Sequence, residues 1–113
     1  MIAVKLNVIG GCMDWLWTWS GKCFGYRDGD HLWTYDGRHV GRFSGDTIYD
    51  RHGRYLGEVM NDNRLIRRKG GSSVRSSSFT PWAKRAAYAK YANYAGYAMY
   101  AGYEDFPGPE LFS

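Results

Sequence analysis

A repeat of sixteen residues organises the first half of the chain. Four aspartates follow one another at this interval, and each of the first three begins a unit with one glycine seven residues later and another eleven residues later. Internal repetition at a fixed period indicates that one supersecondary unit is built several times and packed against its own copies. The aspartates are Asp14, Asp30, Asp46 and Asp62, and the glycine pairs are Gly21/Gly25, Gly37/Gly41 and Gly53/Gly57.

Each unit is predicted to be a β-hairpin. In the second unit, DHLWTYDGRHVGRFSG, segments rich in aromatic and β-branched residues flank Asp36-Gly37, a dipeptide typical of a two-residue hairpin turn. Ser20-Gly21 and His52-Gly53 hold the same place in the neighbouring units. Glycine suits this position because the turn requires a positive φ.

A two-residue loop also fixes which residues of a hairpin face each other. It places Trp17 opposite Phe24, and on the other face it places Leu16 opposite Gly25. A glycine that recurs in mid-strand indicates that another part of the chain comes close. We therefore expect the units to crowd around a common axis. The equivalent pairs are Trp33 with Val40, Tyr49 with Leu56, Leu32 with Gly41 and Ile48 with Gly57.

The fourth unit is incomplete in sequence. It begins at Asp62, offers one strand over residues 63–67 and then loses the pattern. Val8-Ile9-Gly10 has the same form as Cys23-Phe24-Gly25, the second strand of the first unit. We therefore expect an N-terminal strand to pair with residues 63–67 and close the ring, because closure removes the exposed strand edges of an open sheet.

The segments LWTYDGRHVGRF and IYDRHGRYLGEV, together with the ring-closing VIGG, resemble the four-fold β-flower family of small bacterial proteins. The resemblance covers about residues 4–69. It implies four β-hairpins about a pseudo-four-fold axis, and it implies no established activity, so no functional residue is carried over. The expected fold is mainly β, with the four hairpins in a closed arrangement and an α-helix added at the C-terminus.

The charge is distributed unevenly along the rest of the chain. Residues 63–103 hold eight Lys/Arg and no acidic residue, whereas residues 104–113 are acidic. Within the basic stretch, residues 70–79 are rich in glycine and serine and are predicted to form a flexible linker. The expected organisation is a hairpin domain (1–69), a linker (70–79), a Tyr/Ala-rich helix (80–103) and an acidic, proline-containing tail (104–113).

Tyrosine occupies every third position of the segment AAYAKYANYAGYAMYAGY, residues 86–103. Thr80 is a good N-cap, Pro81 suits the first helical position and alanine favours helix, so we predict an α-helix from about 81 to 102. On such a helix a three-residue period carries the tyrosines around the whole surface and leaves no polar face. A chain with three residues per turn, as in 3₁₀ or polyproline II structure, would instead align them in a column. The absence of proline within the segment favours the α-helix.

The chain is therefore interpreted as a non-catalytic interaction or structural module that self-associates or binds a protein partner. The candidate contact residues are the repeated tyrosines. One alternative is a nucleic-acid-binding protein that uses the basic stretch 64–85, with tyrosines and tryptophans as stacking groups. Another is a membrane-associated protein that uses the helix at 82–103. The candidate partner-binding residues are Tyr88, Tyr91, Tyr94, Tyr97, Tyr100 and Tyr103, and the candidate anion-binding residues are Arg64, Arg67, Arg68 and Lys69.

No motif for catalysis, for a cofactor or for a small-molecule substrate is found, so an enzyme is not expected. The three histidines, at 31, 39 and 52, fall at different repeat positions and lack metal-ligand spacing. The four repeated aspartates could ring an axis and bind a cation, although we favour a role in their own turns. Cys12 and Cys23 do not form a disulfide framework, and we expect reduced thiols in a cytoplasmic protein.

Overall fold

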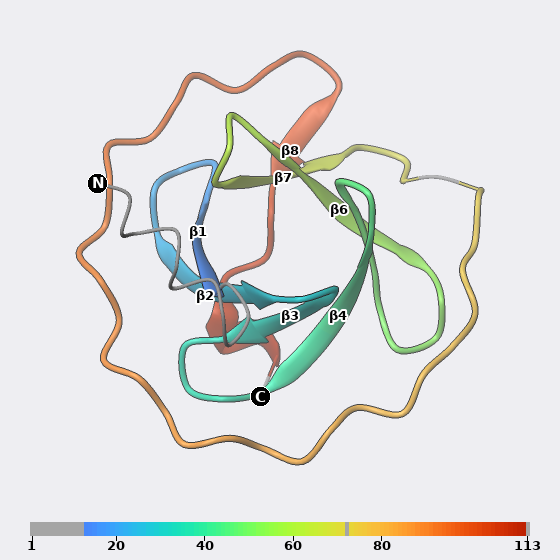
Figure 1. Cartoon of the computed structure of the whole chain (residues 1–113). Coiled ribbons are helices and arrows are strands. Elements are labelled where there is room, and N and C mark those ends of the chain that lie inside the picture. Colours follow the sequence, from blue (N-terminus) through green and yellow to red (C-terminus); the bar gives the residue numbers. More distant parts are fainter. Residues whose placement is uncertain (1–12, 72, 113) are drawn as a thin grey trace, which may run out of the picture.

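The computed structural model describes residues 13–71 and 73–112, and it shows one mainly β unit (Figure 1). Eight strands form a single sheet in chain order, and a short 3₁₀ helix, η1, lies near the C-terminus. The strands are β1 (Met13–Thr18), β2 (Cys23–Asp28), β3 (His31–Thr34), β4 (His39–Ser44), β5 (Thr47–Tyr49), β6 (Tyr55–Met60), β7 (Arg64–Arg68) and β8 (Tyr103–Asp105), and η1 spans Pro109–Phe112.

The sheet closes on itself through β1 and β7. Strands β1 to β7 pair antiparallel in succession, and β7 then pairs parallel to β1, with Trp17 beside Arg64 and Thr18 beside Leu65. The closed, mainly β arrangement predicted from the repeat is therefore confirmed. Closure leaves no free edge within this seven-stranded ring, which protects it from pairing with other chains.

The hairpin register differs from the prediction by one residue at the tips. Trp17 pairs with Cys23 rather than with Phe24, and a bulge after this pair restores the predicted partnership of Leu16 with Gly25. The loop is three residues long, because the Thr18 N–H donates to the Lys22 carbonyl. Its last position is a glycine with positive φ, as this loop class requires. The other two hairpins repeat the change, so Trp33 pairs with His39 and Tyr49 with Tyr55.

The core lies along the axis that the repeated glycines line. Leu32 pairs with Gly41 and Ile48 with Gly57, as predicted. A Cβ on Gly25 would lie 2.0 Å from the Trp33 carbonyl oxygen, so a larger residue has no room there. The expected crowding at these glycines is confirmed. The buried apolar cluster comprises Leu16, Phe24, Leu32, Phe43, Ile48, Leu56, Leu65 and Phe106.

The fourth hairpin is completed from the C-terminal side. Strand β7 is bordered by β6 on one edge and by β1 and β8 on the other, with Ile66, Arg67 and Arg68 paired to β8. The predicted N-terminal strand, around Val8-Ile9-Gly10, lies outside the described residues. Among the described residues, the strands that pair with β7 are β6, β1 and β8.

The predicted α-helix at 80–103 is wrong. Residues 73–102, here called the strap, contain neither helix nor strand and run around the outside of the ring (Figure 1). The strap is the connection inside the fourth hairpin: the chain leaves β7, circles the other three hairpins and returns as β8. Its two ends meet where the Lys69 N–H donates to the Gly102 carbonyl. The helical propensity of alanine is overridden because the hairpins offer acceptors to the strap backbone at a three-residue spacing.

A membrane-spanning helix is also absent from residues 13–71 and 73–112: no helix there has both the length and the apolar character that spanning requires.

Candidate functional site

The strap is held to the hairpin tips by every third backbone N–H. The Tyr94 N–H donates to the Gly21 carbonyl at 2.8 Å, and the Tyr97 N–H donates to the Trp19 carbonyl at 3.1 Å. Three residues before Tyr94, the Tyr91 N–H donates to the Cys23 thiol, and burial raises the pKa of that thiol. Three residues per repeat is the period of a polyproline II chain, which has no internal hydrogen bonds. The tyrosines therefore form the aligned column that a three-residue turn predicts.

The same contacts recur at the second and third hairpins. Gly37 accepts from the Arg85 N–H and Gly53 from the Ser76 N–H, so successive contacts are nine residues apart on the strap and sixteen apart on the ring. In a second set of hydrogen bonds, the Tyr88 N–H donates to the Tyr35 carbonyl and the Phe79 N–H to the Arg51 carbonyl. A nine-residue strap repeat of three triplets thus matches each hairpin. The strap passes the hairpins in reverse order, from the third to the first.

The tip glycines allow the strap to come this close. At Gly37 φ is +92°, and a Cβ there would lie 2.1 Å from the Arg85 carbonyl oxygen. A Cβ on Gly21 or Gly53 would likewise lie 2.0 Å from the carbonyl oxygen of Tyr94 or Ser76. The turn therefore needs glycine for its own φ, as predicted, and needs it again for the strap.

Tryptophans on one face of β1 support the tyrosines of the strap. Tyr94 stacks on Trp17 with ring centroids 4.0 Å apart and an angle of 15° between the planes. Trp15 meets Tyr91 edge-on at 4.8 Å. Alternate residues of a strand share a face, so β1 presents two indoles to the strap, and the first residue of the following loop adds a third to this row. The third, Trp19, packs against Tyr97 and Tyr100 at 5.0 and 5.2 Å.

Polar clamps fix the strap along this row. The indole N–H groups of Trp17 and Trp19 donate to strap carbonyls at Ala92 and Ala98, each at 2.9 Å. Arg64 is 4% exposed and donates to the carbonyls of Trp19 and Ala95. Its guanidinium also lies 4.1 Å from the centre of the Tyr97 ring. The strap is therefore immobilised from both the backbone and the ring side.

The outer surface of this segment is an aromatic row. We call the five strap tyrosines the tyrosine row; their side chains are 46–53% exposed although their inner edges pack on the indoles. Exposed alanines separate them, and Lys90 is the one charged residue between positions 86 and 102. The sixth predicted tyrosine, Tyr103, begins β8 instead and is half-buried. The members of the row are Tyr88, Tyr91, Tyr94, Tyr97 and Tyr100.

The four predicted anion-binding residues do not converge on one site. Arg64 is buried under the strap, Arg67 lies 3.6 Å from Glu104, and Arg68 lies 3.6 Å from Glu58. Lys69 uses its backbone N–H to close the base of the strap. These contacts engage the basic residues after Asp62 largely within the molecule.

Among the described residues, histidines and aspartates considered as metal ligands contact other groups of the protein. The Trp82 N–H donates to Nδ1 of His39, whose Nε2 lies 3.0 Å from Nδ1 of His31. Burial, together with a smaller effect of the neighbouring His31, lowers the pKa of His39 to about 4. Asp30 pairs with Arg27 at 3.6 Å. In the described part of the chain, no group of three or more His, Cys, Asp or Glu side chains is arranged to hold a metal ion.

Sequence reasoning missed the residues that attach the strap. The sequence suggests Arg64 and Arg85 only as cations for an anionic partner and does not assign Trp82 to any contact. In the structure the Arg85 guanidinium lies 3.7 Å from the centre of the Trp33 ring. A signal for them was present. Aromatic residues recur at nine-residue intervals at Phe79, Tyr88 and Tyr97, and again at Trp82, Tyr91 and Tyr100. Three triplets per hairpin would have predicted an extended strap.

Comparison with known proteins identifies the family. Residues 8–99 match the family model described as 4-fold beta flower protein. The chain therefore belongs to this family, as the resemblance in its hairpins indicated. The match extends beyond the hairpins and includes most of the strap. Searches of curated proteins and of solved structures gave no significant match.

Proposed function

We propose that this 4-fold beta flower protein is a non-catalytic interaction module that self-associates through its tyrosine row. The observation that carries the proposal is the row itself: five tyrosines about half exposed, in line, on a backing of indoles. Monomeric soluble proteins rarely expose a contiguous aromatic patch of this kind. Tyrosine is enriched at protein interfaces, because it brings a large contact area for little side-chain entropy.

The rigidity of the row supports a role in binding. The backbone N–H groups of Tyr88, Tyr94 and Tyr97 donate to hairpin carbonyls. The indoles of Trp15, Trp17 and Trp19 restrict the ring positions. A surface ordered before association loses less entropy when it binds. The alanines between the rings add no bulk, so an opposing ring can pack between them.

A second copy of the chain is the occupant that the charges favour. Lys90 lies near the start of the row and Glu104 just beyond its end. Glu104 pairs with Arg67 at 3.6 Å, but its side chain is 44% exposed and stays accessible to a partner. A two-fold axis brings residue i against j and j against i. Two rows packed antiparallel would therefore place each Lys90 near the partner's Glu104. The same patch on two copies would then be electrostatically self-complementary.

The mass of the full-length protein in solution tests this proposal. Static light scattering at micromolar concentration should give twice the mass of the 113-residue chain. Replacing the exposed alanines Ala92 and Ala98 by glutamate should return a monomer, because two carboxylates would be buried in the interface. Ala83→Glu is the matched control, since this alanine is exposed on the strap before the row begins, and it should leave the dimer intact.

A monomer at all concentrations would overturn self-association. A dimer that survives Ala92→Glu/Ala98→Glu, with unfolding unchanged, would show that the row is not the interface. Binding of a single-stranded oligonucleotide that weakens steeply with salt and is lost in the same variant would replace the proposal by nucleic-acid stacking.

A further inference from the structure

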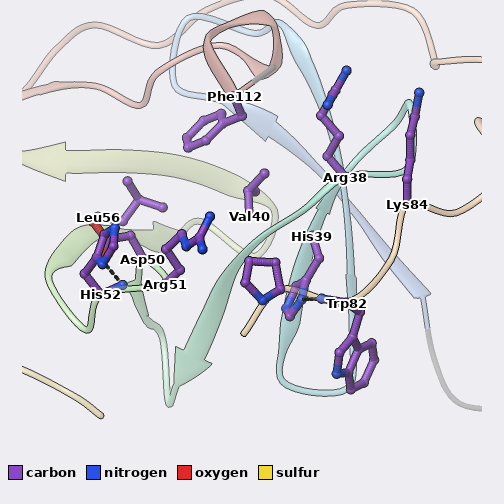
Figure 2. Close-up of a pocket in the computed structure, with 11 residues that line it drawn as sticks. Arg38, His39, Val40, Asp50, Arg51, His52, Leu56, Trp82, Lys84 and Phe112 are labelled. Carbon is purple, nitrogen blue, oxygen red and sulfur yellow. Dashed lines mark hydrogen bonds between the residues drawn. The ribbon is translucent and has the colours of Figure 1, made fainter. Parts of the chain in front are cut away.

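A basic cavity lies between the second and third hairpins, beneath the start of the strap (Figure 2). Its volume is about 500 Å³. Arg38, Arg51 and Lys84 line it from the second hairpin, the third hairpin and the strap. Apolar surface comes from Val40, Leu56, Pro81, Trp82 and Phe112, and His39, His52 and Asp50 complete the wall.

The positive charge of this cavity is only partly compensated within the protein. Among the described residues, Arg51 and Lys84 have no carboxylate partner, and Arg38 pairs with Asp36 at 3.4 Å. Asp50 is the acidic residue of the lining. Its carboxylate already accepts the backbone N–H groups of His52 and Arg54 and pairs with the Arg54 guanidinium. Two cations therefore remain available to a ligand.

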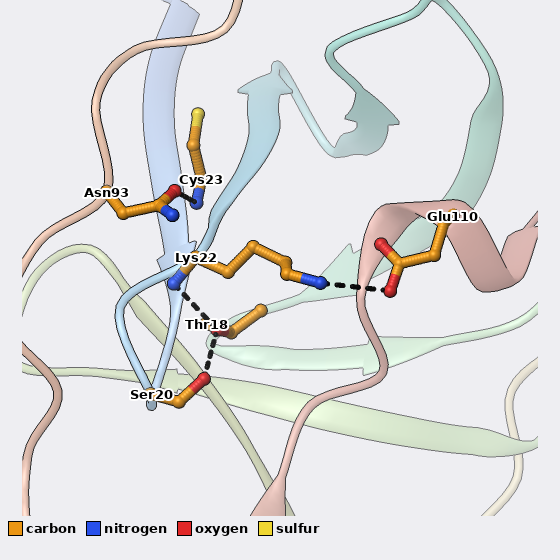
Figure 3. Close-up of polar contacts among 6 residues, drawn as sticks. All are labelled: Thr18, Ser20, Lys22, Cys23, Asn93 and Glu110. Atoms are coloured by element: carbon orange, nitrogen blue, oxygen red, sulfur yellow. Dashed lines mark hydrogen bonds and ion pairs between the residues drawn. The ribbon is translucent and has the colours of Figure 1, made fainter.

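At the equivalent place one repeat earlier, the protein's own tail supplies a carboxylate. Sixteen residues before Arg38 stands Lys22, at the junction of the first and second hairpins. There, Nζ of Lys22 lies 3.0 Å from a carboxylate oxygen of Glu110, which η1 carries (Figure 3). Pro109 and Glu110 line a smaller cavity at that junction, together with Tyr35 and Asp36. The chain's own tail thus places a carboxylate beside the repeat-related cation.

The second junction carries more positive charge than the first at the equivalent positions. Arg51 corresponds to Tyr35 in the sixteen-residue repeat, and Lys84 corresponds to Asn93 in the nine-residue strap repeat. The junction that receives Glu110 therefore has one lysine at these three positions, whereas the second junction has three cations. From the same tail, Phe112 reaches the second cavity and contributes an apolar surface, but no described carboxylate joins its lining besides Asp50.

We propose that the cavity of Arg38, Arg51 and Lys84 binds a carboxylate ligand that carries an adjoining apolar group. The carboxylate takes the position that Glu110 holds at the first junction, and the apolar group packs on Leu56 and Phe112. Arg51 and Lys84 donate charge-assisted hydrogen bonds, which are stronger than those between neutral groups. The proposal does not depend on the tyrosine row, so it stands or falls separately from self-association.

A tetrapeptide that copies the internal occupant is the probe. The sequence PELF, capped at both ends, should bind the full-length protein in calorimetry at constant ionic strength. Its glutamine analogue, PQLF, should bind about tenfold more weakly or not at all, because it lacks the charge. Inorganic phosphate serves as a second anion, and it should bind more weakly than PELF because it has no apolar group.

Matched variants locate the binding. Arg51→Tyr and Lys84→Asn install the residues that the first junction carries, so both are compatible with the fold, and circular dichroism checks this. Each should weaken PELF binding about tenfold, as expected for the loss of one charge-assisted contact. Lys69→Asn removes an equal charge outside the cavity and should have no effect.

Three results would overturn the proposal. One is no heat of binding with PELF at about 5 mM, well above the range of a specific contact. Another is equal binding of PELF and PQLF, or equal binding by the Arg51→Tyr and Lys84→Asn variants. The third is phosphate binding as tight as PELF binding, because the site would then recognise charge without the apolar group.

Discussion

The ring and the strap differ in where their backbone groups find hydrogen-bond partners. In each hairpin the strands bond each other through an antiparallel ladder with one bulge, so the unit carries its own backbone partners. The strap has no such ladder, and among its described residues the N–H groups that bond to the ring recur at every third position. Its conformation is therefore set by the surface beneath it. Local sequence governs the ring, whereas long-range contacts govern the strap.

The largest expected effect comes from breaking the contact between a hairpin tip and the strap. Gly37→Ala should lower the free energy of unfolding by about 4 kcal/mol, from positive-φ strain together with overpacking against the strap carbonyl. Gly45→Ala is the control: its φ is +63°, but no atom lies within 4 Å of the added Cβ. It should cost about 1–2 kcal/mol. Urea unfolding of both variants measures the difference, and equal losses would show that the strap contact contributes nothing.

A somewhat smaller effect is expected from the buried clamp. Arg64→Met removes two hydrogen bonds from a charged donor to strap and tip carbonyls, and should lower the free energy of unfolding by about 3 kcal/mol. Arg67→Met breaks an ion pair whose side chains are 36% and 44% exposed, and should cost less than about 1 kcal/mol. Similar losses in the two variants would contradict the assignment of Arg64 as the clamp.

Acid should weaken the strap through His39. Its Nδ1 accepts the Trp82 N–H, and its pKa is lowered to about 4, below the usual 6.5. Because the unfolded chain binds the proton more readily between these values, stability is full above pH 6.5 and falls as the pH drops toward 4. The expected loss from pH 7 to pH 5 is about 2 kcal/mol.

The repeat supplies the control for this pH dependence. Cys23 holds the equivalent position in the first hairpin, so His39→Cys keeps an acceptor for the strap that does not titrate in this range. Urea unfolding at pH 7 and pH 5 should show most of the pH dependence removed. The pKa of His31 is also lowered by burial and accounts for the remainder. An unchanged slope in His39→Cys would exclude His39 as its source.

The smallest effect is expected from a variant that loosens the strap while the ring stays closed. Trp17→Phe keeps a ring beneath Tyr94 but loses the indole donor to the Ala92 carbonyl, and should cost about 1 kcal/mol. Hydrogen exchange should quicken at the Tyr91 and Tyr94 amides while the amides of β5 and β6 stay protected. Uniform quickening over the whole chain would mean that strap and ring open as one unit.

The hairpins could be predicted because their signals are local and repeated. The repeat of aspartate and glycine correctly gave four hairpins, closure and the pairing of Leu16 with Gly25. The loop length was wrong because a positive-φ glycine suits a three-residue loop as well as a two-residue one. The added residue moved Trp17 opposite Cys23, and the bulge at Phe24 compensated for it. No residue near the tip distinguishes the two loops by propensity.

The candidate site could be predicted in part. The tyrosines at 88, 91, 94, 97 and 100 were identified, and their three-residue period was the correct clue. The helix was wrong because propensity describes an isolated segment, whereas this one lies against Trp15, Trp17 and Trp19 and against carbonyls at the tips. The role of Arg64 was missed for the same reason, since its partners lie far along the chain.

By itself, the sequence determined the number of hairpins, their glycine positions, the closed arrangement and the three-residue period of the tyrosines. All of these depend on periodicity, which a chain expresses locally. Only the tertiary structure decided what occupies the fourth hairpin and how residues 73–102 are folded. Tyr103 joins β7 and the strap remains extended because the hairpin tips offer hydrogen-bond acceptors and aromatic surface that a free segment lacks. Those partners exist only once the ring has closed.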